Sequence, residues 1–141
     1  MTGPRSGHAI LPHTADVMVS AWADTAEACL AEAVRGFVAC FADTRASRPV
    51  RAVGFSFDPG PDTELLIEVL EEVVYLLDAG DEVPVQVALA RTTHGGLVGE
   101  FGVAPRVAVP LVGAAPKGIS RHQLRFEHLD DVWRCRFVVD V

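Results

Sequence analysis

The sequence predicts a single α+β domain, a two-layer arrangement in which two helices pack on a mostly antiparallel or mixed β-sheet. Two segments have helical periodicity, strand-like segments gather in the second half of the chain, and turn residues separate them. Strands and helices that alternated along the whole chain would instead indicate a parallel sheet. No repeat or long linker divides the 141 residues, so we expect one domain over 1–141, with 1–7 as a frayed start.

The first strand and the first helix are predicted within residues 17–41. Val17, Val19 and Ala21 fall on one face of a strand and alternate with residues of the other face, as in a half-buried strand. Asp24 fits the N-cap of the following helix, with Glu27 as its capping-box partner. The helix is indicated by apolar residues at helical spacing: Leu30, Ala33, Val34, Phe37, Val38 and Phe41.

A second helix and six further strands are expected after residue 50. A strand is predicted at 53–57, and the turn residues 58–61 end it. Asp62 or Thr63 can cap the second helix, which buries Leu66, Val69, Leu70, Val73 and Leu77. The remaining strands are predicted at 85–89, 97–103, 107–112, 119–126 and 132–139, with hairpin turns at 94–96 and 130–131.

Composition limits the classes of function. A formal net charge of −7 and a pI near 5.1 oppose strong autonomous binding to nucleic acid, so we expect contact with RNA only indirectly, through a basic partner. Three cysteines without metal-type spacing, and no signal segment, indicate a reduced cytoplasmic protein. Charged residues interrupt the apolar runs far short of the roughly 20 residues that a membrane helix needs, so no membrane role is expected.

Few segments are candidates for chemistry. The chain lacks a phosphate-binding glycine loop, a paired-histidine zinc motif, a nucleophile elbow and a redox cysteine pair. Three places remain: the segment 13–16 at the entrance to the first strand, the segment 117–122 before the penultimate strand, and Asp140 with Val141. An enzyme that acts alone is therefore less favoured.

The residues alone leave two interpretations open at each place. Asp140 ends a strongly apolar strand and is followed by the terminal carboxylate of Val141, and such hard oxygen donors suit calcium, magnesium or manganese. Asp140 would otherwise only solubilise a fraying end. In the same way, Asp16 can cap a turn, His13 can be simply exposed, and Lys117 can be a solvated surface lysine.

Together and in this order, these segments resemble the archease family, small proteins that activate the GTP-dependent RNA ligase of tRNA splicing. The resemblance runs over roughly residues 8–141 and is carried by His-Thr-Ala-Asp-Val at 13–17, the helical segment 65–76, Lys-Gly-Ile-Ser-Arg-His at 117–122 and Val-Val-Asp-Val at 138–141. The chain departs from the family pattern at Val69, at Glu71 and at Ala115-Pro116.

The resemblance implies a metal-bearing tip in which the loop before the first strand meets the end of the chain. Asp16, Asp140 and an oxygen of Val141 would bind a divalent metal, calcium before magnesium or manganese. His13, Lys117 and His122 would face the partner or its ligand. The implied role is to promote guanylylation of the ligase histidine from GTP, so that the ligase supplies the nucleophile and this protein acts as a non-catalytic activator.

Two other functions are weighed against this one. The first is a chaperone-like binding module for an RNA-modifying enzyme such as a tRNA methyltransferase, which would survive loss of the metal ligands. The second is a small metal-dependent hydrolase built around Asp16 and Asp140. Only His13 could serve as its general base, and such a base must lie within hydrogen-bond reach of the attacked water.

Overall fold

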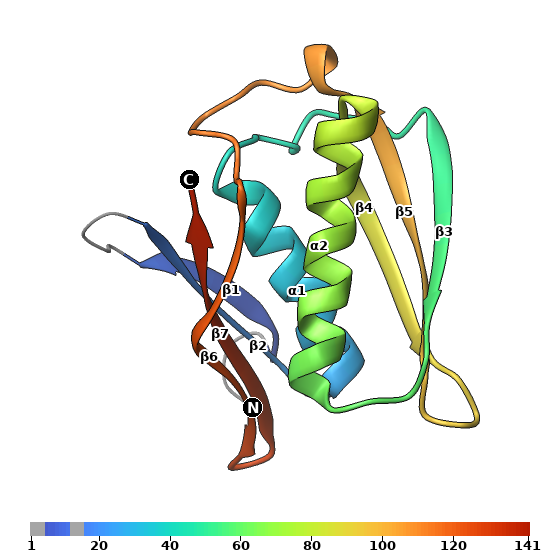
Figure 1. The fold of residues 1–141 in the computed structure, drawn as a ribbon, viewed down its shortest axis with the longest axis vertical. Helices are drawn as coiled ribbons and strands as arrows, with labels where there is room; N and C mark the ends of the chain where they lie inside the picture. The colour runs from blue at the N-terminus through green and yellow to red at the C-terminus, as the bar shows by residue number, and fades with distance from the viewer. Residues whose placement is uncertain (1–4, 12–15) are drawn as a thin grey trace.

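The computed structural model describes residues 5–11 and 16–141. Its strands form two antiparallel sheets, and the two helices lie between them (Figure 1). Sheet A has the order β1 (Gly7–Leu11), β2 (Val17–Ala23), β7 (Val132–Asp140) and β6 (Gly118–Leu129). Sheet B has the order β3 (Arg51–Phe57), β5 (Leu97–Pro105) and β4 (Glu82–Arg91). The predicted α+β class is confirmed, with its strands divided between two sheets.

Sheet A is built from both ends of the chain. Its central pair joins β2 to β7, with a register that runs from Val17 opposite Val139 to Ala23 opposite Trp133. Because the two strands are antiparallel, the start of β2 and the end of β7 lie at the same end of the sheet. This arrangement brings together two segments that are more than a hundred residues apart in sequence.

Helix α1 (Ala26–Ala39) fills the space between the sheets and contacts strands of both. Its predicted apolar face is buried, and Phe37 packs edge-on against Phe41 and against Phe137 of β7. The predicted cap is wrong by one residue: Thr25 is the N-cap, and its hydroxyl accepts a hydrogen bond from the Ala28 amide at 3.1 Å. Asp24 forms an ion pair with Arg5 instead, at 2.6 Å.

Helix α2 (Asp62–Gly80) buries the five residues that its periodicity predicted. It contacts β6 of sheet A and β4 of sheet B. The predicted side-chain cap is wrong, because the N-cap is Pro61, which has no side-chain acceptor. Asp62 instead lies 2.5 Å from the guanidinium group of Arg91. At the other end, Asp81 takes up the left-handed conformation that closes the helix.

Two strand predictions differ from the structure. Strand β1 was not expected, because the segment 7–11 has no clear alternation of apolar and polar residues. The expected strand at 107–112 is instead a short 3-10 helix, Arg106–Ala108, followed by a single bridge between Leu111 and Ala42. Pro110 lies within this segment and lacks the amide hydrogen that a strand ladder needs, and Pro105 ends β5 just before it.

Both predicted hairpin turns are confirmed. Gly95 has a φ of 88° in the turn between β4 and β5. Asp130 and Asp131 have φ values of 53° and 62° in the two-residue turn between β6 and β7, the positive values that such tight hairpins require. Within residues 5–11 and 16–141, neither helix combines the length and the apolar composition needed to cross a lipid bilayer.

Candidate functional site

The candidate site lies where β2 begins and β7 ends. Val17 pairs with Val139, so Asp16 and Asp140 are the next residues beyond that pair, one on the β2 side and one on the β7 side. Asp140 is the last residue of β7, and Asp16 comes directly before β2. Directly opposed residues of an antiparallel pair have Cα atoms about 4.5–5.5 Å apart. The fold therefore brings the main chains of Asp16 and Asp140 to adjoining positions, although they are far apart in sequence.

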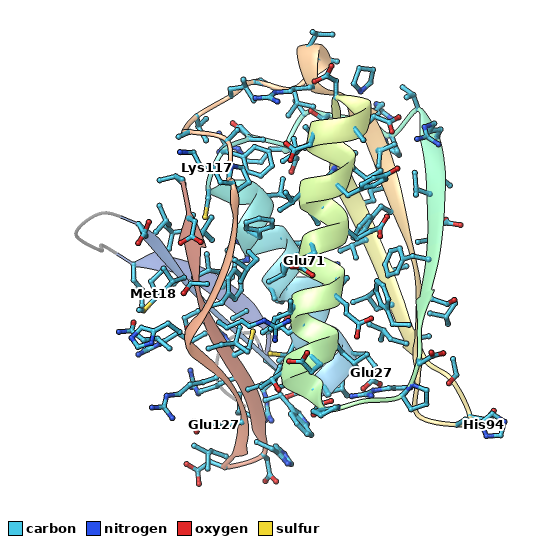
Figure 2. The ribbon with its side chains drawn as sticks, in the orientation of Figure 1. Met18, Glu27, Glu71, His94, Lys117 and Glu127 are labelled. Carbon is cyan, nitrogen blue, oxygen red and sulfur yellow. The ribbon has the colours of Figure 1, made fainter. Side chains whose placement is uncertain are left out.

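Lys117 reaches the same end of sheet A from the other side of β7. Its main-chain amide donates a hydrogen bond of 2.7 Å to the carbonyl oxygen of Asp140, and the next residue, Gly118, pairs with Asp140 in the ladder. The Lys117 side chain is exposed and lies near the end of the chain (Figure 2). Asp140 is thus flanked by the start of β2 on one side and by Lys117 on the other.

The other expected site residues have different positions. Val141 follows Asp140 and is 37% exposed. His122 is exposed on β6, where pairing with β7 is interrupted between Ser120 and Arg125, and its amide donates to the Ser120 hydroxyl at 3.1 Å. The structure therefore does not bring His122 into the group around Asp140. His13 lies outside the described residues.

The charges at this end of sheet A favour a cation. Within residues 5–11 and 16–141, neither Asp16 nor Asp140 forms an ion pair, and like charges at adjoining positions of a strand pair destabilise it. Carboxylate and main-chain oxygens are hard donors, a set that fits calcium, magnesium or manganese. In the described part of the chain, no group of three or more His, Cys, Asp or Glu side chains is placed so that it could hold a metal ion. A metal here would therefore also need main-chain, terminal, water or partner oxygens.

The groups with shifted pKa values lie elsewhere. Hydrogen bonds from Arg45 lower the pKa of Asp43 to about 2, and burial raises the pKa of Cys40 to about 11. On α2, partial burial and the neighbouring carboxylates of Glu64 and Asp58 raise the pKa of Glu68. Of these three groups, Asp43 lines the cavity along α1 that is described next.

A cavity of about 560 Å³ lies along α1 and was not anticipated from the sequence. Its lining combines His8 of β1, Arg35 of α1, the loop residues Asp43 and Arg45, and Gln86 of β4. With the loop that contains Val112, five separate segments supply the lining, so no local pattern in the sequence could have indicated it. None of the expected site residues that the structure describes lines this cavity.

The fold and the site define a class of protein: a small α+β domain with helices between two antiparallel sheets and an oxygen-rich end where its first and last segments meet. A sequence profile described as the archease protein family matches residues 8–141. The chain belongs to the archease family.

Relatives and solved structures agree with this assignment. The chain is 40% identical over 139 residues to the "Probable protein archease" of two Mycobacterium tuberculosis strains, CDC 1551 / Oshkosh and ATCC 25618 / H37Rv, covering 99% of this chain and 77% of each relative. Protein 1598 of Methanobacterium thermoautotrophicum has a similar fold, with a TM-score of 0.74 at 19% identity over 96% of this chain and 99% of that one. An archease of Thermotoga maritima, described as a possible chaperone, gives a TM-score of 0.66 at 17% identity over 100% and 98% of the two chains.

Proposed function

We propose that this protein is a cytoplasmic, non-catalytic activator of a GTP-dependent RNA ligase in tRNA splicing. It would promote guanylylation of the ligase and so sustain repeated turnover. The observation that carries the proposal is the β2–β7 register, which brings Asp16 to the position next to Asp140, together with the hydrogen bond between Lys117 and Asp140. Membership of the archease family supports an RNA ligase as the partner, the role that the resemblance implies.

The residues at this end of sheet A would bind a divalent metal. Asp16, Asp140 and an oxygen of Val141 would hold it, with calcium the first expectation and magnesium or manganese the alternatives. The bound ion would supply positive charge for oxygens of a triphosphate, in coordination positions that the few protein ligands leave open. His13 would stand beside the ion.

Lys117 would face the partner or the phosphate-bearing ligand of the partner. Its ammonium group is exposed, and its main chain is fixed to Asp140 by the 2.7 Å hydrogen bond. It would therefore offer a positioned cation to phosphate groups at the ligase active site. The contribution of this protein would be positioning and electrostatic stabilisation, with the nucleophile coming from the ligase.

Reconstitution with the cognate ligase tests the proposal. Guanylylation from labelled GTP would be measured with wild type, Asp16→Asn and Asp140→Asn in calcium, magnesium and manganese. We expect stimulation to fall by at least roughly 10- to 100-fold in both variants, because loss of groups that only orient metal ligands already has an effect of that size. Asp78→Asn is the matched control, because Asp78 is an exposed carboxylate at the end of α2. Full stimulation by Asp140→Asn would contradict the metal site.

A chaperone-like function is the second candidate, because the Thermotoga maritima archease is described as a possible chaperone. In that case the protein would bind an RNA-modifying enzyme such as a tRNA methyltransferase and keep it active. The same variants separate the two functions. Protection of the methyltransferase from heat inactivation that is equal for wild type and Asp140→Asn, without any stimulation of the ligase, would favour the chaperone.

A further inference from the structure

The outer face of sheet A, turned away from both helices, carries a concentration of positive charge. Along β7, Cys135 and Phe137 are buried toward the helices, so the alternating residues Arg134 and Arg136 point outward and are exposed. Arg125 of β6 is exposed beside them. Met18 and Glu127, which are labelled, help to locate this face in Figure 2. We name Arg125, Arg134, Arg136 and the neighbouring Trp22 the arginine face.

The arrangement of these arginines works against the stability of the sheet. Arg125 lies directly opposite Arg136 in the ladder, and like charges in that position repel. In the described part of the chain, Arg134 and Arg136 have no ion pair, and Arg125 has only Glu127 at 3.8 Å. Six other arginines, by contrast, have a carboxylate oxygen within 2.8 Å: Arg5, Arg35, Arg45, Arg51, Arg91 and Arg121. Glu127 lies directly opposite Arg134 in the ladder without forming an ion pair with it, so the three guanidinium groups leave a local excess of positive charge for an external anion.

Trp22 adds an aromatic surface to this positive charge. It pairs with Arg134 on one side and with Gly7 on the other. A Cβ atom at Gly7 would come within 2.7 Å of the indole ring, so the glycine allows the ring to lie close to the strand. The guanidinium carbon of Arg134 is 6.0 Å from the ring centroid. Trp22 is partly exposed, so a planar group can reach it.

We propose that the arginine face binds single-stranded RNA, with phosphates at the three arginines and a base stacked on Trp22. Arg134 and Arg136 are two residues apart on one strand, which separates their Cα atoms by roughly 7 Å, and the Cα atom of Arg125 lies about 5 Å from that of Arg136. Guanidinium groups bind phosphates through paired hydrogen bonds, and aromatic side chains stack on bases of any sequence. Exposed guanidinium groups beside a partly exposed indole are the combination with which proteins hold the phosphates and bases of a single strand.

The arginine face and the candidate metal site share one strand. Arg136 and Asp140 are four residues apart on β7, or roughly 13 Å, and alternation places both on the outer side. Val138 lies between them on that side and is only 5% exposed, so the accessible part of the arginine face stops short of Asp140. Only the identity of this RNA as the ligase substrate rests on the proposed function. Binding itself follows from the charges and the indole.

The proposal is tested with the protein alone and a fluorescently labelled single-stranded RNA of about 12 nucleotides. Anisotropy would be recorded from about 50 to 200 mM salt for wild type and for the double variant Arg134→Gln, Arg136→Gln. We expect the variant to bind about tenfold more weakly at low salt, with a log–log salt slope shallower by about 0.7 for each phosphate contact removed. The control is Arg48→Gln with Arg106→Gln, which loses the same charge at two arginines that have no ion pair in the described residues.

Two single variants sharpen the test. Trp22→Leu is expected to weaken binding without changing the salt slope, because stacking releases no counterions. Asp140→Asn is expected to bind RNA at least as well as wild type, so failure of the metal site leaves this proposal intact. Circular dichroism melting of each variant shows whether it is folded.

The proposal is overturned if wild type shows no salt-dependent RNA binding at about 50 mM salt. It is equally overturned if the control double variant loses as much affinity as the arginine-face variant. Loss of binding to the ligase in the arginine-face variant, with RNA binding unchanged, would assign the surface to a protein partner instead.

Discussion

Asp43 and Arg45 form a two-point ion pair at the edge of the cavity along α1. The Arg45 Nε and Nη2 atoms donate to the two carboxylate oxygens of Asp43 at 2.9 and 2.7 Å, and the Arg45 amide donates as well, at 3.1 Å. These hydrogen bonds favour the ionised carboxylate. The pair is exposed to solvent, so its influence is expected on the protonation of Asp43 more than on the stability of the fold.

The first prediction concerns this carboxylate. The pKa of Asp43 should be about 2, below its ordinary value of 3.8, because hydrogen bonds from Arg45 stabilise the charged form. A lowered pKa in the folded state adds stability that is present above pH 3.8 and is lost as pH falls through 2. NMR titration of the Asp43 carboxyl carbon in wild type and Arg45→Gln measures it. An equal pKa in the two proteins would show that Arg45 is not the cause.

The second prediction concerns the three thiols. Burial raises the pKa of Cys40 to about 11, and contact with Cys29 followed by burial raises that of Cys135. The thiolate is the reactive form, so at pH 8 the folded protein should react slowly with a disulfide reagent, and denaturant should release three equivalents rapidly. Fast reaction of one thiol in the native protein, lost in Cys40→Ser, would place Cys40 in a more open environment.

At the scale of the elements, the packing of α1 on sheet A depends on Gly36. A Cβ atom there would lie 2.9 Å from Cγ1 of Val19 and 3.1 Å from Cβ of His8. These two residues belong to β2 and β1, so the helix approaches both strands at this position. A larger residue must push the helix away from the sheet.

The third prediction follows from that approach. Gly36→Val should lower the free energy of unfolding by about 1–3 kcal/mol, the usual result of overpacking a core. Gly54→Val is the control, because the nearest atom to a Cβ at Gly54 is 4.0 Å away and valine favours strands. Urea denaturation measures both. Equal midpoints for Gly36→Val and wild type would mean that the helix adjusts without cost.

The sequence correctly predicted the helices and strands whose apolar residues recur at regular spacing. The buried faces of α1 and α2 were found from helical spacing, and the hairpin turns were found from residues that tolerate positive φ. The helix caps were misplaced because several adjacent polar residues could serve, and tertiary ion pairs occupied Asp24 and Asp62. The division into two sheets depends on strand pairing, which local patterns do not contain.

The residues alone predicted only the residue types of the candidate site, and the meeting of the segment before the first strand with the end of the chain was expected from the resemblance to the archease family. Asp16, Lys117 and Asp140 were indicated by their segments, but their proximity depends on the β2–β7 register and on the hydrogen bond from Lys117. His122 was grouped with them by sequence, whereas an interruption of the β6–β7 ladder separates it from Asp140. The arginine face was missed because strand alternation gathers its members from three strands, and because the net charge of −7 concealed a local excess of positive charge.

The fourth prediction concerns the whole molecule. A metal that binds only the folded protein stabilises it by mass action, by about 2.7 kcal/mol at a hundredfold excess over the Kd. Calcium should therefore raise the Tm of wild type by about 5 °C or more, and that of Asp140→Asn much less. Differential scanning calorimetry measures the shift, with Asp78→Asn expected to respond as wild type does. No shift with calcium, magnesium or manganese would argue against a metal at the end of sheet A.

The joining of β2 to β7 also affects how this protein can change during evolution. A substitution within either strand alters one side chain, but a one-residue insertion or deletion reverses the facing of every residue beyond it. An insertion between Arg136 and Asp140 would turn Asp140 toward the helices and shift it relative to Asp16. The number of residues in these two strands should therefore vary less among relatives than the identity of the residues. Insertions should be tolerated better in the loops around residues 43–50 and 106–116.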